Sequence, residues 1–336
     1  MGNQPTIFDV AKLAKVAPST VSRYLNSSSY VANETKKKIE IAVKKLQYRP
    51  SRFAKNLRSQ SMFNVSVVVP DLNWEFYGEI VDPLSIYATL KGVEIIVSVT
   101  HDIEKIKQIV FDFAFTRRID GVILCTPDSK TVETFSKLSV PVIAIDWENM
   151  IGGDLEVDTI NIDNKRAAFM AMDYLYSKGH KEILVITGGN EIQSSLERVK
   201  GVMLFSERHT GTKIFVFDGD FTPNAGYNIT KTFLKSNKNI TAIFAFNDLM
   251  AFGALNALTE KGLKVPDDIS IMGFDNSFIS KYTFPSLTTV DQPKDKIGIV
   301  AAQLIMDRLN AQRASKTRDV VIPFTIIERN SVKELK

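Results

Sequence analysis

The chain has 336 residues, 44% hydrophobic and 24% charged, which is ordinary for a globular protein with room for two or three domains. It contains no run of 18 apolar residues and no basic start followed by an apolar stretch, so we expect neither a membrane span nor a secretion signal and predict a cytoplasmic protein. Its charge is uneven, because residues 1–60 carry 12 Lys and Arg against three acids, a net charge of +9, whereas the remainder carries −5. A basic unit on a mildly acidic body indicates a polyanion-binding module, although charge alone does not separate DNA from RNA or a membrane surface.

Three short helical patterns follow one another in the basic segment. The first is expected after Thr6, an N-cap residue with Asp9 three positions on. The second starts at Pro18, where a missing N–H costs nothing, and the third starts at Asn33. The residues expected to face the core are Val10, Leu13 and Ala14 in the first helix, Val21, Tyr24 and Leu25 in the second, and Ile39, Ala42, Val43 and Leu46 in the third.

The second helix has a small, polar and cationic outer face made of Pro18, Ser19, Ser22 and Arg23. Such a helix between two others is typical of a helix-turn-helix, whose second helix enters the DNA major groove. Arg23 can pair with guanine there, and the two serines can reach bases or phosphates. The alternative that these residues leave open is a three-helix protein-interaction bundle with a solvated basic face.

Four stretches of this segment closely resemble the headpiece of the LacI/GalR repressor family: TIFDVAKLA (6–14), STVSRYLN (19–26), YRP (48–50) and RFAKNLR (52–58). The resemblance implies a sequence-specific DNA-binding regulator whose Pro18, Ser19 and Arg23 read the major groove. It also implies contacts to the DNA backbone from Thr20, Ser22, Asn26 and Tyr48.

Residues 51–58 join the headpiece to the rest of the chain, with Phe53, Ala54 and Leu57 on one helical face. An isolated helix this short is marginal in water, so we expect it to form only when it docks. The resemblance implies that two such hinges pair in the minor groove and that Leu57 wedges between base steps; an ordinary linker is the alternative. The complete set of expected DNA contacts is Thr6, Pro18, Ser19, Thr20, Ser22, Arg23, Asn26, Tyr48, Arg52, Lys55, Asn56 and Leu57.

From residue 64 onward, short apolar runs alternate with helical stretches. Runs rich in Val and Ile between helices predict parallel sheets with crossover connections. The runs are 64–71, 93–100, 121–126, 140–146, 182–188, 213–218, 241–247 and 269–275. These are too many for one compact sheet, and we expect the chain to cross between two lobes at 157–164, 288–293 and 321–327.

The predicted fold is therefore α/β, with an all-α helix-turn-helix headpiece (1–50), a hinge (51–61) and a two-lobed, periplasmic-binding-protein-like core (62–336) of two doubly wound parallel sheets. The N-lobe is expected at about 62–160 and 291–322, and the C-lobe at about 161–290 and 323–336.

Polar side chains follow the predicted strands directly, and ligands of open α/β sheets bind beyond these carboxyl ends. Carboxylates and amides there suit a ligand rich in hydroxyls, and Arg198 adds a fork of donors. Aromatic side chains nearby can cover the apolar face of a sugar ring. The expected effector contacts are Asp71, Phe76, Asp146, Trp147, Arg198, Phe221, Asn247 and Asp275. For each single residue, a capping or core role is the alternative.

The core resembles the same family through ERVKG (197–201), FNDLMA (246–251), GFD (273–275) and IER (327–329). The resemblance implies that Arg198, Asn247 and Asp275 bind effector, with Asp146 and Phe221 carried over more weakly.

No nucleotide-binding fingerprint, catalytic triad or metal-ligand spacing occurs, so we expect no enzyme, metal or cofactor. The single cysteine, Cys125, lies in an apolar run and is predicted to be a buried thiol, which fits a reducing compartment. A sugar-binding transport receptor shares the core fold, but the basic headpiece argues against it.

The resulting hypothesis is a homodimer that binds double-stranded DNA at a near-palindromic operator and acts as a repressor. A small ligand, expected to be a sugar, closes the cleft, disfavours hinge ordering and lowers DNA affinity. The alternative is a corepressor-type regulator that responds to a nucleobase, a sugar phosphate or a partner protein, as purines and a phosphocarrier protein act on some members of the family.

Overall fold

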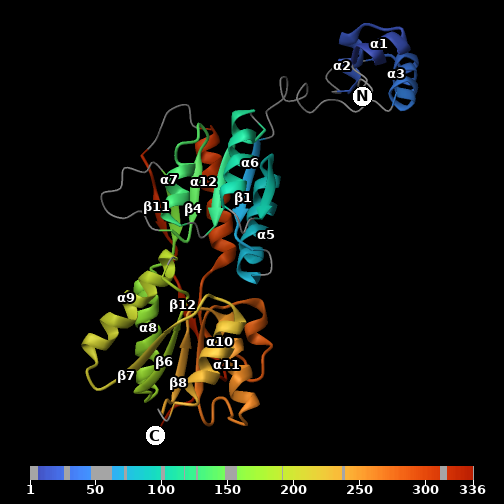
Figure 1. Cartoon of the computed structure of the whole chain (residues 1–336). Coiled ribbons are helices and arrows are strands. Elements are labelled where there is room, and N and C mark those ends of the chain that lie inside the picture. The colour runs from blue at the N-terminus through green and yellow to red at the C-terminus, as the bar shows by residue number, and fades with distance from the viewer. Residues whose placement is uncertain are drawn as a thin grey trace. The chain divides into compact units, whose positions relative to one another are not determined.

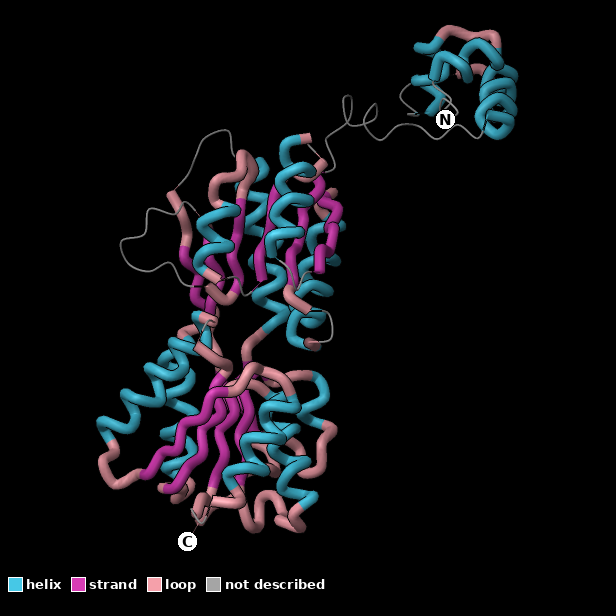
Figure 2. The backbone as a smooth tube through the Cα atoms, viewed as in Figure 1, coloured by secondary structure: helices cyan, strands magenta, loops and turns pink. Residues whose placement is uncertain are grey.

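The structure is a computed structural model, and the chain divides into two compact units, Met1–Met62 and Phe63–Lys336 (Figures 1 and 2). It describes residues 7–25, 31–46, 63–71, 74–99, 103–116, 118–125, 128–147, 157–190, 192–236, 239–310 and 316–335. None of the helices within these ranges is long and apolar enough to cross a membrane.

The first unit holds three helices, α1 (Ile7–Ala14), α2 (Pro18–Leu25) and α3 (Asn33–Leu46). Helix α1 ends where Lys15 takes a positive φ of 56° and the Val16 amide donates back to Ala11 O at 3.0 Å. The buried cluster is Val10, Ala11, Ala14, Val21, Ile39 and Ala42.

One core prediction in this unit is wrong, because Leu13 is 42% exposed and Ala11 is buried in its place. Helix α1 therefore buries positions i, i+1 and i+4 rather than i, i+3 and i+4, and small alanines let its backbone approach α3. The side chain of Leu25 lies outside the described part of the structure.

The N-lobe of the second unit is built on a parallel sheet in the order β11-β5-β4-β3-β1-β2. Its strands are β1 (Phe63–Val69), β2 (Val93–Val99), β3 (Gly121–Cys125), β4 (Val142–Ile145), β5 (Asp158–Asn161) and β11 (Asp319–Val321). Its helices are α5 (Glu75–Leu90), α6 (Ile103–Phe115), α7 (Ser129–Phe135) and α12 (Lys294–Asn310). Successive residues of β1 point to opposite faces, so Val67 packs in the cluster that includes α5 and α12, and Val68 in the one that includes α6 and α7.

The C-lobe sheet has the order β12-β10-β9-β8-β6-β7. Its strands are β6 (Glu182–Thr187), β7 (Lys213–Asp218), β8 (Ala242–Ala245), β9 (Ser270–Asp275), β10 (Thr288–Asp291) and β12 (Thr325–Ile327). Its helices are α8 (Asn164–Ser177), α9 (Gln193–Arg208), α10 (Pro223–Phe233), α11 (Asp248–Glu260) and the 3-10 helix η1 (Phe278–Lys281). In Figure 1, α8 and α9 cover one face of this sheet, and α10 and α11 cover the other.

The described chain passes between the lobes after β5, after β10 and between β11 and β12. The predicted doubly wound fold is thus confirmed, with one difference: β12 runs antiparallel to β10, whereas the other strand pairs are parallel. The strand β12 runs opposite to β10 because the chain leaves the C-lobe at the end of β10 and returns to it from β11 of the N-lobe.

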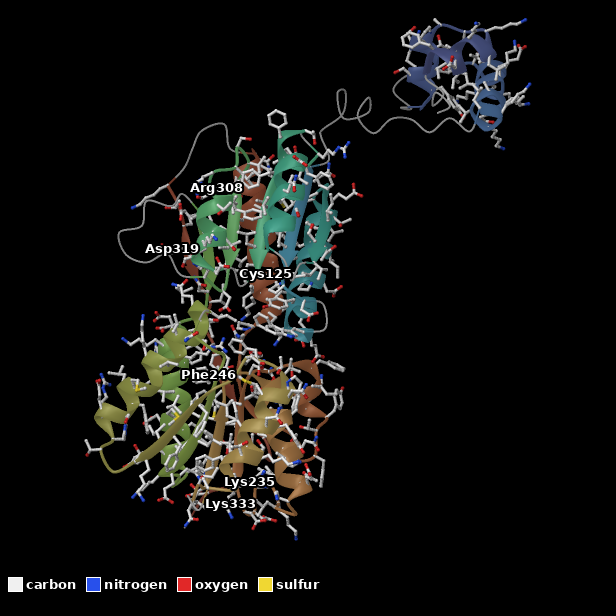
Figure 3. All side chains as sticks on the ribbon, in the orientation of Figure 1. Cys125, Lys235, Phe246, Arg308, Asp319 and Lys333 are labelled. Atoms are coloured by element: carbon white, nitrogen blue, oxygen red, sulfur yellow. The ribbon has the colours of Figure 1, made fainter. Side chains whose placement is uncertain are left out.

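The central strands of both sheets are buried, as Val- and Ile-rich parallel strands should be, and all five residues of β3 are buried. The edge strands β2 and β7 are mostly exposed or half-buried. Cys125 lies at the end of β3 inside the N-lobe (Figure 3), and burial raises the pKa of its thiol to about 12. The thiol is consequently protonated and unreactive at neutral pH.

Candidate functional site

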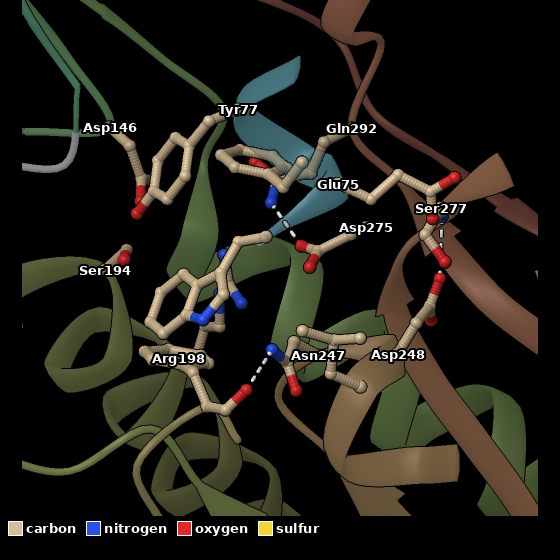
Figure 4. Close-up of a pocket in the computed structure, with 14 residues that line it drawn as sticks. Glu75, Tyr77, Asp146, Ser194, Arg198, Asn247, Asp248, Asp275, Ser277 and Gln292 are labelled. Carbon is tan, nitrogen blue, oxygen red and sulfur yellow. Dashed lines mark hydrogen bonds between the residues drawn. The ribbon is translucent and has the colours of Figure 1, made fainter. Parts of the chain in front are cut away.

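A pocket lies between the two lobes, at the carboxyl ends of their strands (Figure 4). Both sheets change winding direction where β1 meets β3 and where β6 meets β8, and such switch points are where open sheets bind ligands. About 530 Å³ of empty space, part of it continuous with solvent, is lined by Trp74, Glu75, Phe76, Tyr77, Asp146, Ser194, Arg198, Phe221, Asn247, Asp248, Leu249, Asp275, Ser277 and Gln292.

Arg198 forms the floor of the pocket on the C-lobe side. Its side chain comes from α9 and is only 2% exposed, and its guanidinium stacks on the ring of Phe274 at 3.6 Å. Nε donates to Asn164 Oδ1 at 2.9 Å, and Nη1 donates to the carbonyl of Phe246, at the end of the strand β8 (Figure 3). Burial lowers the pKa of the guanidinium, while Asp275 and Asp146 oppose that shift. An arginine fixed in this way presents donors in a rigid plane to a bound acceptor.

Asp275 faces Arg198 and ends strand β9. Burial and, to a lesser extent, the nearby Asp248 raise the pKa of its carboxyl to about 7, against the opposing effects of Arg198, Lys294 and Gln292. Gln292 Nε2 donates to Asp275 Oδ1 at 2.7 Å (Figure 4). A carboxylate accepts several hydrogen bonds, so Asp275 can hold two adjacent hydroxyl groups of a ligand.

Asp248 lies behind Asp275 and is buried at the start of α11. Its carboxylate accepts one hydrogen bond from the Ser277 amide and another from Thr289 Oγ1, both at 2.7 Å. Burial raises the pKa of this carboxyl to about 6. The neighbouring Asn247 caps α11, because its Oδ1 accepts from Met250 N at 2.9 Å and its Nδ2 donates to Phe221 O at 2.9 Å. Asn247 therefore lines the pocket and, through its hydrogen bond to the Phe221 carbonyl, also holds the backbone of Phe221 in position.

The N-lobe side of the pocket carries Asp146 and a group of aromatic rings. Asp146 follows β4 and is 8% exposed, and its Oδ1 accepts a hydrogen bond from Asn164 Nδ2 at 3.4 Å. The rings of Trp74 and Tyr77 stack with centroids 5.7 Å apart and planes at 11°. Trp74 also meets Phe221 of the C-lobe edge-on at 6.1 Å, so an aromatic contact spans the pocket from lobe to lobe.

Three pocket residues hold a backbone conformation that side chains disfavour. Asp146, Phe221 and Asp275 have φ values of 58°, 64° and 111°, and each stands just after a strand or a loop that ends at the pocket. Such conformations cluster at ligand sites, where the surrounding structure enforces them. The ring of Phe221 lies so close over Gly188 that a Cβ there would be 1.9 Å from Cζ.

The structure brings six of the expected effector contacts to this pocket: Phe76, Asp146, Arg198, Phe221, Asn247 and Asp275. Asp71 and Trp147 do not line it. Trp147 is 3% exposed and packs with Val68 and Val157 in the cluster under α6 and α7, so the prediction that it covers a sugar ring is wrong.

Several lining residues were not predicted from the sequence, among them Trp74, Tyr77 and Gln292. Trp74 and Tyr77 open helix α5 just after the loop that follows β1, the same position that singled out Phe76. Gln292 directly follows β10, which was predicted only as a crossing between the lobes.

The predicted DNA-reading surface is described on helix α2. Pro18, Ser19 and Arg23 are exposed, Thr20 and Ser22 are half-buried, and Tyr24 OH donates to Glu40 at 2.9 Å, which ties α2 to α3. The other predicted DNA contacts lie outside the described residues: Thr6, Asn26, Tyr48, Arg52, Lys55, Asn56 and Leu57.

Comparison with known proteins places both units in one family. Residues 6–51 match the family described as bacterial regulatory proteins, lacI family, and residues 172–332 match the periplasmic binding protein-like domain. The chain is 31% identical to the transcriptional repressor PurR of Erwinia tasmaniensis over 98% of this chain and 97% of that protein. It is 33% identical to the transcriptional repressor CytR of Escherichia coli K12 over 91% and 90%.

Two solved structures extend this likeness to three dimensions. The Lac repressor dimer bound to operator and the anti-inducer ONPF superposes with a TM-score of 0.83 at 26% identity, covering 98% of this chain and all of that one. The regulator CelR in complex with cellobiose has a TM-score of 0.72 at 27% identity, covering 97% and 99%. The chain therefore belongs to the LacI family of bacterial regulatory proteins, and it is a DNA-binding transcriptional repressor under the control of a small ligand.

Proposed function

We propose that the ligand of this repressor is a neutral, hydroxyl-rich molecule, a sugar or sugar derivative, held in the pocket between the lobes. The observation that carries the proposal is the pair formed by the buried Arg198 and the half-buried Asp275 beside an aromatic wall. The carboxylate accepts from neighbouring hydroxyls and the guanidinium donates to a ring or hydroxyl oxygen, while aromatic faces cover the C–H surface of the ring.

The charge of the pocket supports a neutral ligand over a phosphorylated one. The described lining residues include four carboxylic acids, Glu75, Asp146, Asp248 and Asp275, against a single guanidinium. An anion would meet a pocket lining of net negative charge, and like-charge repulsion would oppose its binding. One related structure, a LacI-family regulator from Enterococcus faecium with a TM-score of 0.72 at 26% identity, is described with bound ribose.

A nucleobase is the second candidate, because aromatic rings such as those of Trp74 and Phe221 line the pocket and can stack on a planar heterocycle. In that case the ligand acts as a corepressor and raises DNA affinity. The two candidates differ in the sign of their effect on operator binding.

On the DNA side, we propose that two headpieces, residues 1–50, occupy the half-sites of a near-palindromic operator while hinges 51–61 fold between them. Arg23, Ser19 and Pro18 are exposed on α2 and read the bases. Thr20 and Ser22 grip the backbone, together with the predicted contacts at Thr6, Asn26 and Tyr48. Replacing Arg23 by Ala should weaken operator binding by about 5- to 150-fold, which corresponds to 1–3 kcal/mol.

We further propose that the chain is a homodimer that uses an apolar patch at η1. The exposed patch consists of Phe278, Ile279, Tyr282 and Phe284, and Phe284 is 98% exposed. A two-fold axis through one such patch buries it on both copies at once. Phe284→Ser should shift sedimentation toward monomer, whereas Met203→Ser, which changes an exposed residue on α9, should leave the dimer intact.

A thermal-shift screen of the full chain against monosaccharides, disaccharides, sugar phosphates and nucleobases tests the ligand proposal, since a bound ligand stabilises the core by mass action. The hit is then titrated with and without operator DNA. Linkage requires that operator change the affinity for the ligand by the factor by which the ligand changes the affinity for operator. Stabilisation only by sugar phosphates would contradict the neutral-ligand proposal.

A further inference from the structure

Lys294 is a buried cation at the first position of helix α12, and its side chain is only 4% exposed. Its ammonium donates to the carbonyls of Asp275 and Asn276, the latter at 3.0 Å, and lies 3.2 Å from Glu79 Oε2. The two carbonyls belong to the loop after β9 in the C-lobe, whereas Glu79 lies on α5 of the N-lobe. One ammonium group therefore joins the two lobes.

The loop that Lys294 holds is a strained one. Asp275 and Asn276 have φ values of 111° and 52°, which residues other than glycine rarely adopt. An ammonium that accepts no hydrogen bonds and donates to both carbonyls favours this backbone over relaxed alternatives. This backbone conformation matters to the pocket because it orients the side chain of Asp275. That side chain faces Arg198 and accepts a hydrogen bond from Gln292 (Figure 4).

Two carboxylates of α5 grip the same loop from the N-lobe. Glu79 Oε1 accepts from the Phe278 amide at 2.8 Å, and Glu75 accepts from the Ile279 amide. These are the first amides of η1, which have no partner within that helix. Together with Lys294, the N-lobe thus contacts four consecutive peptide groups of the C-lobe segment 275–279. The Ser277 amide within this segment donates instead to Asp248 of the C-lobe.

The N-lobe part of this arrangement is rigid. Helices α5 and α12 pack so closely that a Cβ on Gly298 would lie 2.3 Å from the carbonyl oxygen of Ile80. Glu75, Glu79 and Lys294 therefore move as one body, and opening of the cleft on this side must break their contacts to the segment 275–279.

We infer that Lys294, Glu79 and Glu75 form a latch that closes the two lobes and, in the same movement, fixes the ligand-accepting position of Asp275. Lys294 is a positioning residue in this device, since it acts on the ligand site through Asp275. The inference rests on the proposed function only in treating the pocket as the ligand site.

Two measurements on the ligand-free, full-length chain test the latch. Hydrogen exchange reports on the amides of Phe278 and Ile279, which Glu79 and Glu75 protect. Spin labels on Cys residues at Lys91 and Lys261, which are exposed in the N-lobe and C-lobe, report the distance between the lobes in a Cys125→Ala background. Lys294→Met, which keeps the length of the side chain without its charge, should raise exchange in 275–282 by tenfold or more and broaden the distance distribution.

Lys178→Met is the matched control, because Lys178 pairs with Glu328 at 2.9 Å entirely within the C-lobe. It should leave both readouts unchanged. Glu79→Met is the second variant, in case Lys294→Met does not fold, because it removes both the charge and the acceptor of the Phe278 amide. It should raise exchange of Phe278 while the rest of the C-lobe stays protected. Unchanged exchange and distances in a folded Glu79→Met chain would overturn the latch, whether or not any sugar binds.

Discussion

Arg198 donates from Nε to Oδ1 of Asn164 at 2.9 Å, and both side chains are at most 2% exposed. The other end of the same amide, Nδ2, lies 3.4 Å from Asp146 Oδ1. Asn164 is the first residue of α8, directly after the chain enters the C-lobe, so it stands between an arginine of the C-lobe and a carboxylate that follows a strand of the N-lobe. The amide orients both groups that the ligand is proposed to meet.

Asn164→Ala should destabilise the core by about 1–3 kcal/mol, because it leaves a buried charged donor without its acceptor. It should also weaken binding of the sugar identified by the screen, since Arg198 loses its fixed orientation. Urea unfolding of the ligand-free chain measures the first effect and ligand titration the second. Asn310→Ala, which removes an exposed side-chain amide bonded to Met306 O, is the control and should change neither by a measurable amount.

Arg198→Lys should shift the response of operator binding to much higher ligand concentrations while leaving operator binding itself intact. A lysine keeps the charge but loses the planar fork and the stacking on Phe274, so the change is not conservative here. The expected loss of ligand affinity is roughly 10- to 150-fold, the range of hydrogen bonds to charged groups. Gel shifts at fixed salt with and without ligand measure it, and a variant that still releases operator at wild-type ligand concentrations would contradict the role given to Arg198.

The affinity for a hydroxyl-rich ligand should fall as the pH is lowered below about 7. The carboxyl of Asp275 has a pKa of about 7 in the folded core, far above its ordinary value, so the free protein increasingly carries it protonated below that pH. Binding two hydroxyl donors requires the ionised carboxylate, so below this pH the protein must release a proton when the ligand binds. The affinity for the ligand then falls by a factor that approaches tenfold for each pH unit. Calorimetric titration between pH 5.5 and 8.5 in buffers of different ionisation enthalpy measures both the affinity and the released proton.

The same raised pKa affects stability in the opposite direction. A carboxyl whose pKa is higher in the folded than in the unfolded state makes folding bind protons, so its contribution favours the ligand-free core at low pH and is lost as the pH rises through about 7. Asp248, with a pKa of about 6, acts in the same sense. Asp275→Asn should therefore flatten the dependence of the melting temperature on pH between 5 and 8 in the absence of ligand.

Much of the fold was predictable because buried parallel strands have apolar sequences. The eight apolar runs recognised between residues 64 and 275 correspond to the strands β1 to β4 and β6 to β9. The polar residue at the end of a strand was also a good guide to Asp146, Asn247 and Asp275. The rule failed at Asp71, which follows β1 but does not line the pocket, and the separate prediction for the aromatic Trp147 failed as well. Asp146 takes φ of 58°, the chain turns sharply, and Trp147 is directed into the cluster under α6 and α7 instead of the pocket.

The residues that sequence analysis did not find depend on long-range geometry. Lys294 reads as an ordinary basic residue at a helix start, yet it is buried because its partners come from α5 and from the loop after β9, 215 and 19 positions away in the chain. Leu13 has the helical spacing of a core residue and is exposed, because the alternative face with Ala11 packs closer to α3. No local pattern distinguishes these cases.

Gly188→Ala offers a test of the aromatic wall that leaves every hydrogen-bonding group of the pocket in place. An added Cβ at this position would lie 1.9 Å from Cζ of Phe221, so the ring has to swing toward the pocket space. Because a ring end can move, the stability loss should stay at about 1–3 kcal/mol, the usual cost of overpacking. The affinity for the ligand should fall much more, since the displaced ring occupies its place.

Tryptophan fluorescence provides the readout, because the chain has only Trp74 and Trp147 and Trp74 alone lines the pocket. In a Trp147→Phe background, the emission of Trp74 should shift when Gly188 becomes Ala, since its edge-on contact with Phe221 is altered. Gly211→Ala is the matched control, because a Cβ there meets no atom within 4 Å. A Gly188→Ala chain with unchanged emission and unchanged ligand affinity would show that Phe221 does not form a wall of the site.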